Sequence, residues 1–167
     1  DGGVPLSEIG LFSAVTLPYA LKFLWAPMMD RYVPPFLGRR RGWMFVTQVA
    51  LIVSIGALGM FDPARSTAAV AALAVVVVFF SASQDIVLDA YRREILADSE
   101  LGMGSAIHVQ AYRVAGFIPG SLGLFLAGSV SWEINFTVMA AFMGVGVLLT
   151  LFIKEPKTLA PPPSNLW

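Results

Sequence analysis

The sequence contains no cysteine and a single histidine, His108, among its 167 residues. The absence of cysteine excludes disulfide bonds, thiolate metal ligands and cysteine nucleophiles. Charged residues are also scarce, at 13%, whereas a soluble domain usually carries about 25%. Eleven basic and eleven acidic residues leave no net charge that would attract nucleic acid. We therefore expect no metal site, no cofactor and no nucleic-acid partner.

Apolar residues, by contrast, make up 57% of the chain. They gather in five segments, each close to the roughly 20 residues that a helix needs to cross a bilayer. The predicted spans are residues 6–28, 43–61, 67–90, 104–129 and 132–153. A soluble bundle would need polar helix faces, but residues 68–80 contain no polar side chain. We therefore expect an all-α, polytopic transmembrane bundle.

Several features refine this organisation. Residues 1–155 are expected to form the bundle, and the Pro-rich residues 156–167 a flexible linker. Pro18, Pro27 and Pro119 are expected to break or bend the helices that contain them. The chain begins with Asp1-Gly2-Gly3, without an initiator methionine or a signal-like region. We therefore expect a fragment of a longer protein.

Basic residues concentrate in alternate links between the predicted spans. These residues are Arg31, Arg39, Arg40, Arg41, Arg92, Arg93, Lys154 and Lys157. Loops rich in Lys and Arg lie on the cytoplasmic side of a membrane. We therefore predict that the links 29–42 and 91–103 and the linker 156–167 are cytoplasmic, and that the N-terminus of the chain lies on the periplasmic side.

A few ionisable residues fall inside the predicted spans, where they are costly and commonly face a cavity or a partner. Lys22, Asp85 and Arg113 lie on three different spans, at about 10 to 16 Å from the predicted cytoplasmic interface. Asp89 lies one helical turn from Asp85. These four charges are neutral as a group and can pair with one another, although the sequence does not show whether Lys22 pairs with Asp85 or with Asp89. That group either stabilises the bundle or belongs to a transport path.

The chemistry of these side chains suggests separate roles. A buried carboxylate near a movable cation, as Asp85 would be, could bind a proton in one conformation and release it in another. Arg113 stays charged and forms bidentate contacts with carboxylates, which suits an anionic solute. Gln84, Gln110 and Tyr112 offer hydrogen-bond donors and acceptors for a sugar or a peptide. All of these residues are candidates for solute binding or proton coupling.

Two stretches carry a resemblance to a known family. They are KFLWAPMMDRYVPPFLGRRRGW, residues 22–43, and SASQDIVLDAYRREIL, residues 81–96. Both resemble the AmpG-type muropeptide permeases of the major facilitator superfamily, and the similarity continues through residues 102–123. The superfamily's cytoplasmic gating-loop motif corresponds to Asp30, Arg31, Gly38, Arg39, Arg40 and Arg41. Pro34-Pro35-Phe36 is interposed within that motif, a departure that fits the AmpG branch.

The resemblance implies a specific architecture and function. The five spans would be helices two to six of a six-helix N-terminal half, and the first helix and the C-terminal bundle would be missing partners. The whole protein would import anhydro-muropeptides from periplasm to cytoplasm, driven by protons, for cell-wall recycling. Its location would be the bacterial inner membrane, and its partners would be the lipid bilayer, the muropeptide and protons.

Three other interpretations stay open at this point. A related carrier of another anionic solute, such as acetyl-CoA, would need more cations than Lys22 and Arg113 to bind phosphates. An integral-membrane enzyme could use Asp85, Asp89 and His108 as acid–base groups, although no nucleophile–base pair or phosphate-binding loop is visible. A membrane scaffold would bind a stable partner without moving a solute.

Overall fold

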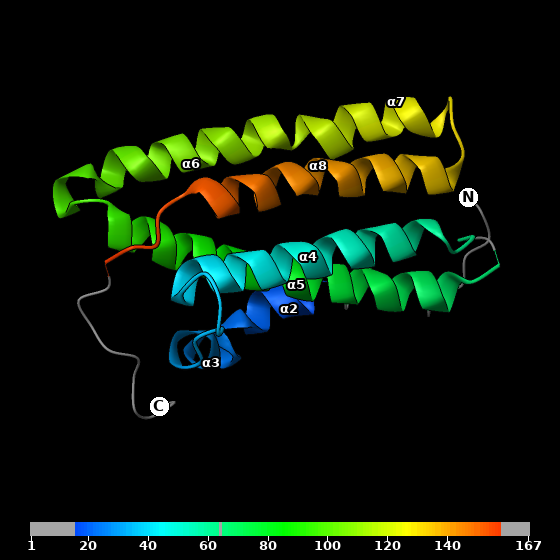
Figure 1. The fold of residues 1–167 in the computed structure, drawn as a ribbon. Coiled ribbons are helices and arrows are strands. Elements are labelled where there is room, and N and C mark those ends of the chain that lie inside the picture. The colour runs from blue at the N-terminus through cyan, green and yellow to red at the C-terminus, as the bar shows by residue number, and fades with distance from the viewer. Residues whose placement is uncertain (1–15, 64, 158–167) are drawn as a thin grey trace.

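The computed structural model describes residues 16–63 and 65–157, and all regular elements within these ranges are helical (Figure 1). The all-α fold class predicted from the sequence is therefore confirmed. The elements are α2 (Leu17–Leu21), the 3-10 turn η1 (Lys22–Leu24), α3 (Ala26–Arg31), α4 (Arg39–Gly59), α5 (Thr67–Ile95), the 3-10 turn η2 (Asp98–Glu100), α6 (Leu101–Ala115), the π-helical turn η3 (Ile118–Leu122), α7 (Gly123–Ala127) and α8 (Trp132–Phe152).

Three of these helices, α4, α5 and α8, are long and apolar enough to cross a membrane. The structure thus supports three of the five predicted spans as single helices. Predicted span 104–129 is divided by η3, so α6 has 15 residues and α7 has 5. Pro119 lies in this turn, where it lacks an N–H and its ring crowds the preceding turn. The physical reason for the interruption is therefore this proline.

The first predicted span, residues 6–28, is also not a single helix in the described part of the chain. Residues 6–15 lie outside the described residues, and the remainder is divided into α2, η1 and α3. Pro18 and Pro27 lie in the first turns of α2 and α3. Proline is tolerated there because the first helical N–H groups have no intrahelical acceptor. The prolines therefore start new short helices at this position.

The helices pack around α4, which lies between α5 and α8 (Figure 1). The short elements α2, η1 and α3 lie against α5, and α7 contacts α8. A small core of Met29, Met44 and Val87 joins α3, α4 and α5. By contrast, α6 makes its main contacts with its own neighbours η2 and η3. The chain therefore forms a packed group of three long helices with a more separate α6.

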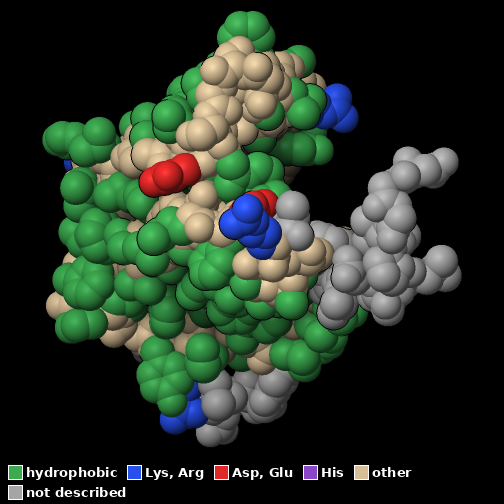
Figure 2. Space-filling view, turned by 90° about the vertical axis from the view of Figure 1, so that its right-hand side faces the viewer, with side chains coloured by type: hydrophobic (Ala, Val, Ile, Leu, Met, Phe, Trp, Pro, Cys, Tyr) green, Lys and Arg blue, Asp and Glu red, His purple; other side chains and the backbone are tan. Residues whose placement is uncertain are grey.

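The two ends of this bundle differ in composition. The first turn of α4 and the last turns of α5 and α8 lie at one end, which we call the arginine end because Arg39, Arg40 and Arg41 lie there (Figure 1). Figure 2 shows the opposite end, where hydrophobic side chains predominate and few charged side chains are in view. The charges that could form a site are therefore concentrated at the arginine end.

Gly38 directs the chain into α4 at the arginine end. Its φ is +86° and its ψ is −174°, a backbone region that is almost restricted to glycine. A Cβ at this position would also lie 2.7 Å from Cδ of Glu155. Gly42 is similarly close-packed, because its Cβ would lie 2.8 Å from Cβ of Pro34. Pro34 and the backbone of Phe36 therefore pack directly on the first turn of α4.

We expect Gly38→Ala to lower the free energy of unfolding by about 1–3 kcal/mol, because alanine is strained in this backbone region. Gly56→Ala is the matched control within α4, since a Cβ there meets nothing within 4 Å. Reversible unfolding in mixed detergent micelles measures both variants. Equal stability of the two variants would show that the conformation of Gly38 and its contact with Glu155 contribute nothing.

Candidate functional site

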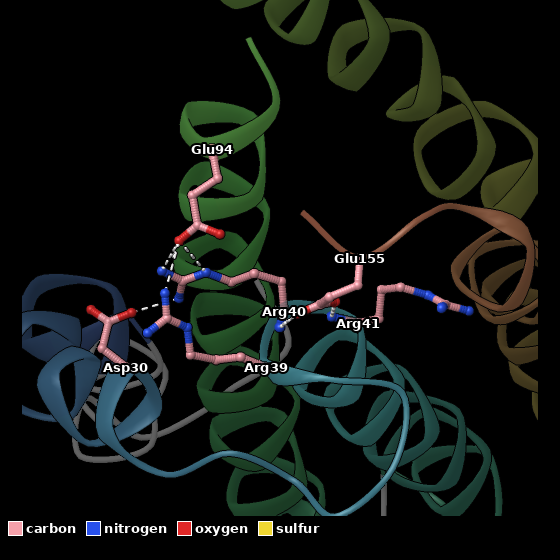
Figure 3. Close-up of polar contacts among 6 residues, drawn as sticks. All are labelled: Asp30, Arg39, Arg40, Arg41, Glu94 and Glu155. Carbon is pink, nitrogen blue, oxygen red and sulfur yellow. Dashed lines mark hydrogen bonds and ion pairs between the residues drawn. The ribbon is translucent and has the colours of Figure 1, made fainter. Parts of the chain in front are cut away.

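The centre of the arginine end is the buried guanidinium of Arg40. This residue is only 6% exposed, and it lies between two carboxylates from different elements (Figure 3). Nη1 lies 2.5 Å from Oδ1 of Asp30 on α3, and Nη2 lies 2.5 Å from Oε1 of Glu94 on α5. Nε of Arg40 donates a further hydrogen bond to the same Glu94 oxygen at 2.9 Å. One cation therefore connects α3, α4 and α5.

Arg39 also approaches Glu94, with its Nη2 at 3.3 Å from Oε1. Two buried polar atoms in this contact have no hydrogen-bond partner among the described residues, Nε of Arg39 and Oε2 of Glu94. A single carboxylate oxygen thus accepts from both arginines. Glu94 therefore has one oxygen free for a further donor.

Glu155 and Arg41 connect α4 with α8 in a reciprocal arrangement (Figure 3). The Glu155 carboxylate, just after α8, accepts from the backbone N–H of Arg40 at 2.8 Å and of Arg41 at 2.9 Å. A carboxylate is favourable there because a helix N-terminus presents unpaired N–H groups and a positive dipole end. The Arg41 side chain in turn donates to the carbonyls of Thr150 and Leu151, at the C-terminus of α8.

The six residues form a network with balanced charge, which we call the charge network. Its members are Asp30, Arg39, Arg40, Arg41, Glu94 and Glu155. Arg39 and Arg40 form ion pairs with Asp30 and Glu94, which compensates the burial of these charges. Glu155 and Arg41 are instead satisfied by backbone groups of α4 and α8. Its contacts join α3, α4, α5 and the segment after α8. The network can therefore fix the relative positions of these elements at one end of the bundle.

The sequence interpretation identified only part of this network. It named Asp30, Arg39, Arg40 and Arg41 but assigned no role to Glu94 or Glu155. The available signal was an acidic residue at the end of each of two apolar spans, on the same predicted side as the arginines. Arg31 and Gly38 were also named. Arg31 lies outside the network, exposed, with its guanidinium 5.9 Å from the centre of the Tyr32 ring.

A second group of polar contacts involves residues 81–85 of α5. The Tyr19 hydroxyl forms a hydrogen bond of 2.9 Å with Oγ of Ser81, and Nε1 of Trp25 donates to Oγ of Ser83 at 3.0 Å. Gln84 lies on another side, where its Oε1 accepts from the Thr47 hydroxyl of α4. Consecutive polar residues of α5 thus contact different neighbouring elements. This part of α5 connects the α2–α3 segment on one side with α4 on the other.

The four charges inside the predicted spans, which could pair with one another, are arranged differently. Asp89 pairs with Arg92 on its own helix, at 2.9 Å, and the Lys22 ammonium lies 5.9 Å from the centre of the Tyr19 ring. Asp85 is half-buried and interacts with the Tyr19 hydroxyl. Within the described ranges no ion pair joins Lys22 or Arg113 to either aspartate. The mutual pairing that the sequence allows is therefore not present among the described residues.

The physical reason for this difference lies in the local structure. Asp89 has a partner at the i+3 position, which a helix places within reach. The helical break at η1 places Lys22 beside Tyr19 instead of Asp85. Gln110, Tyr112 and Arg113 all lie exposed on α6, whose main contacts are not with α5. The structure therefore does not bring Arg113 together with Asp85 and Gln84, and the roles of these residues stay predictions.

We expect Arg40→Met to lower the free energy of unfolding by about 3–5 kcal/mol, because it leaves two carboxylates of the charge network without their shared cation. Arg31→Met is the matched control, and its cost is expected to stay within about 0.5 kcal/mol because Arg31 is exposed. Detergent-mediated unfolding followed by circular dichroism measures both. Indistinguishable unfolding curves for the two variants would contradict a stabilising role for the network.

Comparison with known proteins places the chain in a family. The sequence profile described as Major Facilitator Superfamily matches residues 2–166. An uncharacterized protein of Haemophilus influenzae is 54% identical over 158 residues, which cover 94% of this chain and 37% of that protein. The anhydromuropeptide permease of Escherichia coli is 45% identical over 164 residues, which cover 98% of this chain and 33% of the permease.

Two facts follow from these matches. The chain spans about a third of the length of the relatives that it matches. The resemblance to the AmpG-type branch, based on residues 22–43 and 81–96, is confirmed by an identity that extends over nearly the whole chain. The profile match covers all of the described residues, including the charge network. The chain belongs to the Major Facilitator Superfamily.

Proposed function

We propose that this chain is part of the N-terminal half of a proton-coupled carrier that imports anhydro-muropeptides into the cytoplasm for cell-wall recycling. The observation that carries the proposal is the 45% identity to the Escherichia coli anhydromuropeptide permease over 98% of the chain. Family membership and three helices apolar enough to cross a membrane support a multi-pass membrane carrier. In this proposal the first helix and the C-terminal bundle belong to the longer polypeptide.

The orientation that we propose follows from the arginine end. An excess of Arg and Lys marks cytoplasmic segments of membrane proteins, and Arg39, Arg40, Arg41 and Arg92 lie at this end. The arginine end would then face the cytoplasm of the bacterial inner membrane. The N-terminus of the chain would be periplasmic, and residues 156–167 would form a cytoplasmic linker after the bundle of residues 1–155.

The charge network would act on the cytoplasmic side of the transport cycle. Carriers of this kind alternate access largely by movement of one half of the protein against the other. Such movement requires that the helices within one half keep their positions. The contacts of Arg40 with Asp30 and Glu94, and of Glu155 with α4, supply that constraint. Substitutions that remove these contacts would allow the helices to move relative to one another without changing a residue proposed to bind the solute.

Asp85 is the residue that we propose for proton coupling. It lies half-buried on α5 beside the Tyr19 hydroxyl, which also bonds Ser81 one turn away. A carboxylate at this depth is costly when charged, and the nearby hydroxyl can donate to its charged form or accept from its protonated form. Asp85 can therefore exchange a proton while keeping a hydrogen-bonding neighbour.

The full-length protein with Asp85→Asn tests this proposal. We expect uptake of labelled anhydro-muropeptide into membrane vesicles to lose its response to an imposed proton gradient, because the amide cannot bind and release a proton. Asp98→Asn is the control, since Asp98 lies exposed in the link after α5. Gradient-driven accumulation that persists in Asp85→Asn would exclude this residue as the coupling group.

Arg113 is the residue that we propose for recognition of an anionic group on the solute. We expect Arg113→Gln to weaken muropeptide affinity by roughly 10- to 100-fold, because a hydrogen bond to a charged group contributes about 1.5–3 kcal/mol. Arg93→Gln is the control, because Arg93 is exposed and contacts Asp98 at 3.7 Å. Competition assays measure the affinity in each variant.

The same competition assay distinguishes the proposed muropeptide cargo from the alternative cargo, acetyl-CoA. Acetyl-CoA competes weakly or not at all with labelled muropeptide if the proposed function is right. Stronger competition by acetyl-CoA than by unlabelled muropeptide would instead identify a carrier of another anionic solute. An unchanged affinity in Arg113→Gln would remove Arg113 from the proposed binding site.

A further inference from the structure

One polar cluster inside the predicted spans is separate from the charge network. It joins α2 to α5 through the hydroxyl of Tyr19, which lies 2.9 Å from Oγ of Ser81 and also interacts with the carboxyl group of Asp85. Ser81 and Asp85 are four residues apart, so they lie on the same face of α5. One hydroxyl therefore contacts two groups of α5, and of these two groups Asp85 is the one that can change its charge.

The helical break after α2 places a cation on the same tyrosine. The 3-10 turn η1 begins at Lys22, and the ammonium of this lysine lies 5.9 Å from the centre of the Tyr19 ring. An ammonium over an aromatic face is attracted by the ring. Tyr19 thus holds the cation at its ring and the carboxyl group of Asp85 at its hydroxyl. No ion pair joins these two charges in the part of the chain that the structure describes.

The other charges around this part of α5 are engaged elsewhere. Asp89, one turn along the helix, pairs with Arg92. Helices α3 and α4 also pack on α5, but their charged residues lie at the arginine end, in or beside the charge network. Arg113 lies on α6, whose main contacts are not with α5. Within the described ranges, the segment of α2 and η1 is therefore the element that brings titratable groups to Asp85.

We propose that Tyr19 is a positioning residue: its hydroxyl sets how readily the carboxylate of Asp85 binds a proton. A hydroxyl can both donate and accept. When Asp85 is charged, Tyr19 donates to the carboxylate and accepts from Ser81. When Asp85 is protonated, its carboxyl group donates to Tyr19, which in turn donates to Ser81. The proton comes from water that reaches Asp85 and returns to it, while both hydroxyls keep their own protons and only reverse their direction.

The two directions of this chain of hydrogen bonds differ in free energy. A hydrogen bond to a charged acceptor is stronger than one between neutral groups, so the Tyr19 hydroxyl favours the charged form of Asp85. The ammonium of Lys22 acts in the same direction, because a nearby opposite charge stabilises a carboxylate. Both effects oppose the cost of a charge at this depth in the membrane. Without the hydroxyl, Asp85 should therefore bind its proton at a higher pH.

Infrared spectroscopy of the full-length protein in lipid nanodiscs tests the role of Tyr19. The C=O stretch of a protonated carboxyl group changes with pH, and its loss in Asp85→Asn identifies the band of Asp85. We expect Tyr19→Phe to raise the midpoint of this titration by about one pH unit, because the variant lacks a hydrogen bond to a charged acceptor. An unchanged or lowered midpoint would overturn the proposal.

Ser81→Ala is the matched control for this substitution. Both variants lose the 2.9 Å hydrogen bond between Tyr19 and Ser81, but Ser81→Ala leaves the Tyr19 hydroxyl beside Asp85. We therefore expect the midpoint to stay near its wild-type value in Ser81→Ala. Equal shifts in the two variants would assign the effect to the bond between α2 and α5 and would contradict a specific action of Tyr19 on Asp85.

This inference rests on the proposed role of Asp85 in proton coupling, and the measurement separates the two because it needs no solute. An Asp85 band that titrates but does not move in Tyr19→Phe would exclude Tyr19 and leave Asp85 as the coupling group. A wild-type band that does not titrate would exclude Asp85, and the role of Tyr19 with it. A shifted midpoint in a protein that fails to take up muropeptide would support the role of Tyr19 and contradict the proposed cargo.

Discussion

The burial of Arg40 is the constraint on which the arginine end of this bundle depends. A guanidinium that is 6% exposed requires compensating charge, and Asp30 and Glu94 provide it from two other helices. Once these three residues are fixed, the first turn of α4 is fixed with them. Glu155 can then accept from two backbone N–H groups of that turn, and Arg41 can reach the C-terminus of α8. Gly38 supplies the backbone conformation and the space that this arrangement needs.

The sequence could predict those features that depend on local composition. Runs of about 20 apolar residues predict helices that cross a membrane because every residue of the run contributes to the same signal. The sequence could not predict the partners of Arg40, because Glu94 lies 54 residues away and Glu155 lies 115 residues away along the chain. The same limit explains why the sequence left the partners of Asp89 and Lys22 open; in the structure these are Arg92 and Tyr19. The position of each residue along its predicted span placed Lys22, Asp85 and Arg113 at a similar depth in the membrane. Depth alone does not show toward which neighbouring helix each side chain points.

The polar residues of α5 divide the bundle into two parts with different chemistry. Ser81 and Ser83 contact Tyr19 and Trp25 on one side, and Asp85 lies near this contact. Gln84 contacts α4 on the other side, where its side-chain oxygen accepts from the Thr47 hydroxyl. A change of the α2–α3 segment could therefore alter the surroundings of Asp85 while the charge network keeps α3, α4 and α5 together at the arginine end. The proposed role of Asp85 in proton coupling requires such a combination of a changeable environment and fixed helix packing.

Arg40 and its two carboxylates act as one unit at the arginine end. A double-mutant cycle with Arg40→Met and Glu94→Gln, measured by unfolding of the full-length protein, tests it most directly. We predict that the two substitutions are strongly non-additive, with a coupling free energy of about 1–3 kcal/mol, as expected for residues in one ionic network. Additivity to within about 0.5 kcal/mol, the behaviour of independent sites, would contradict it.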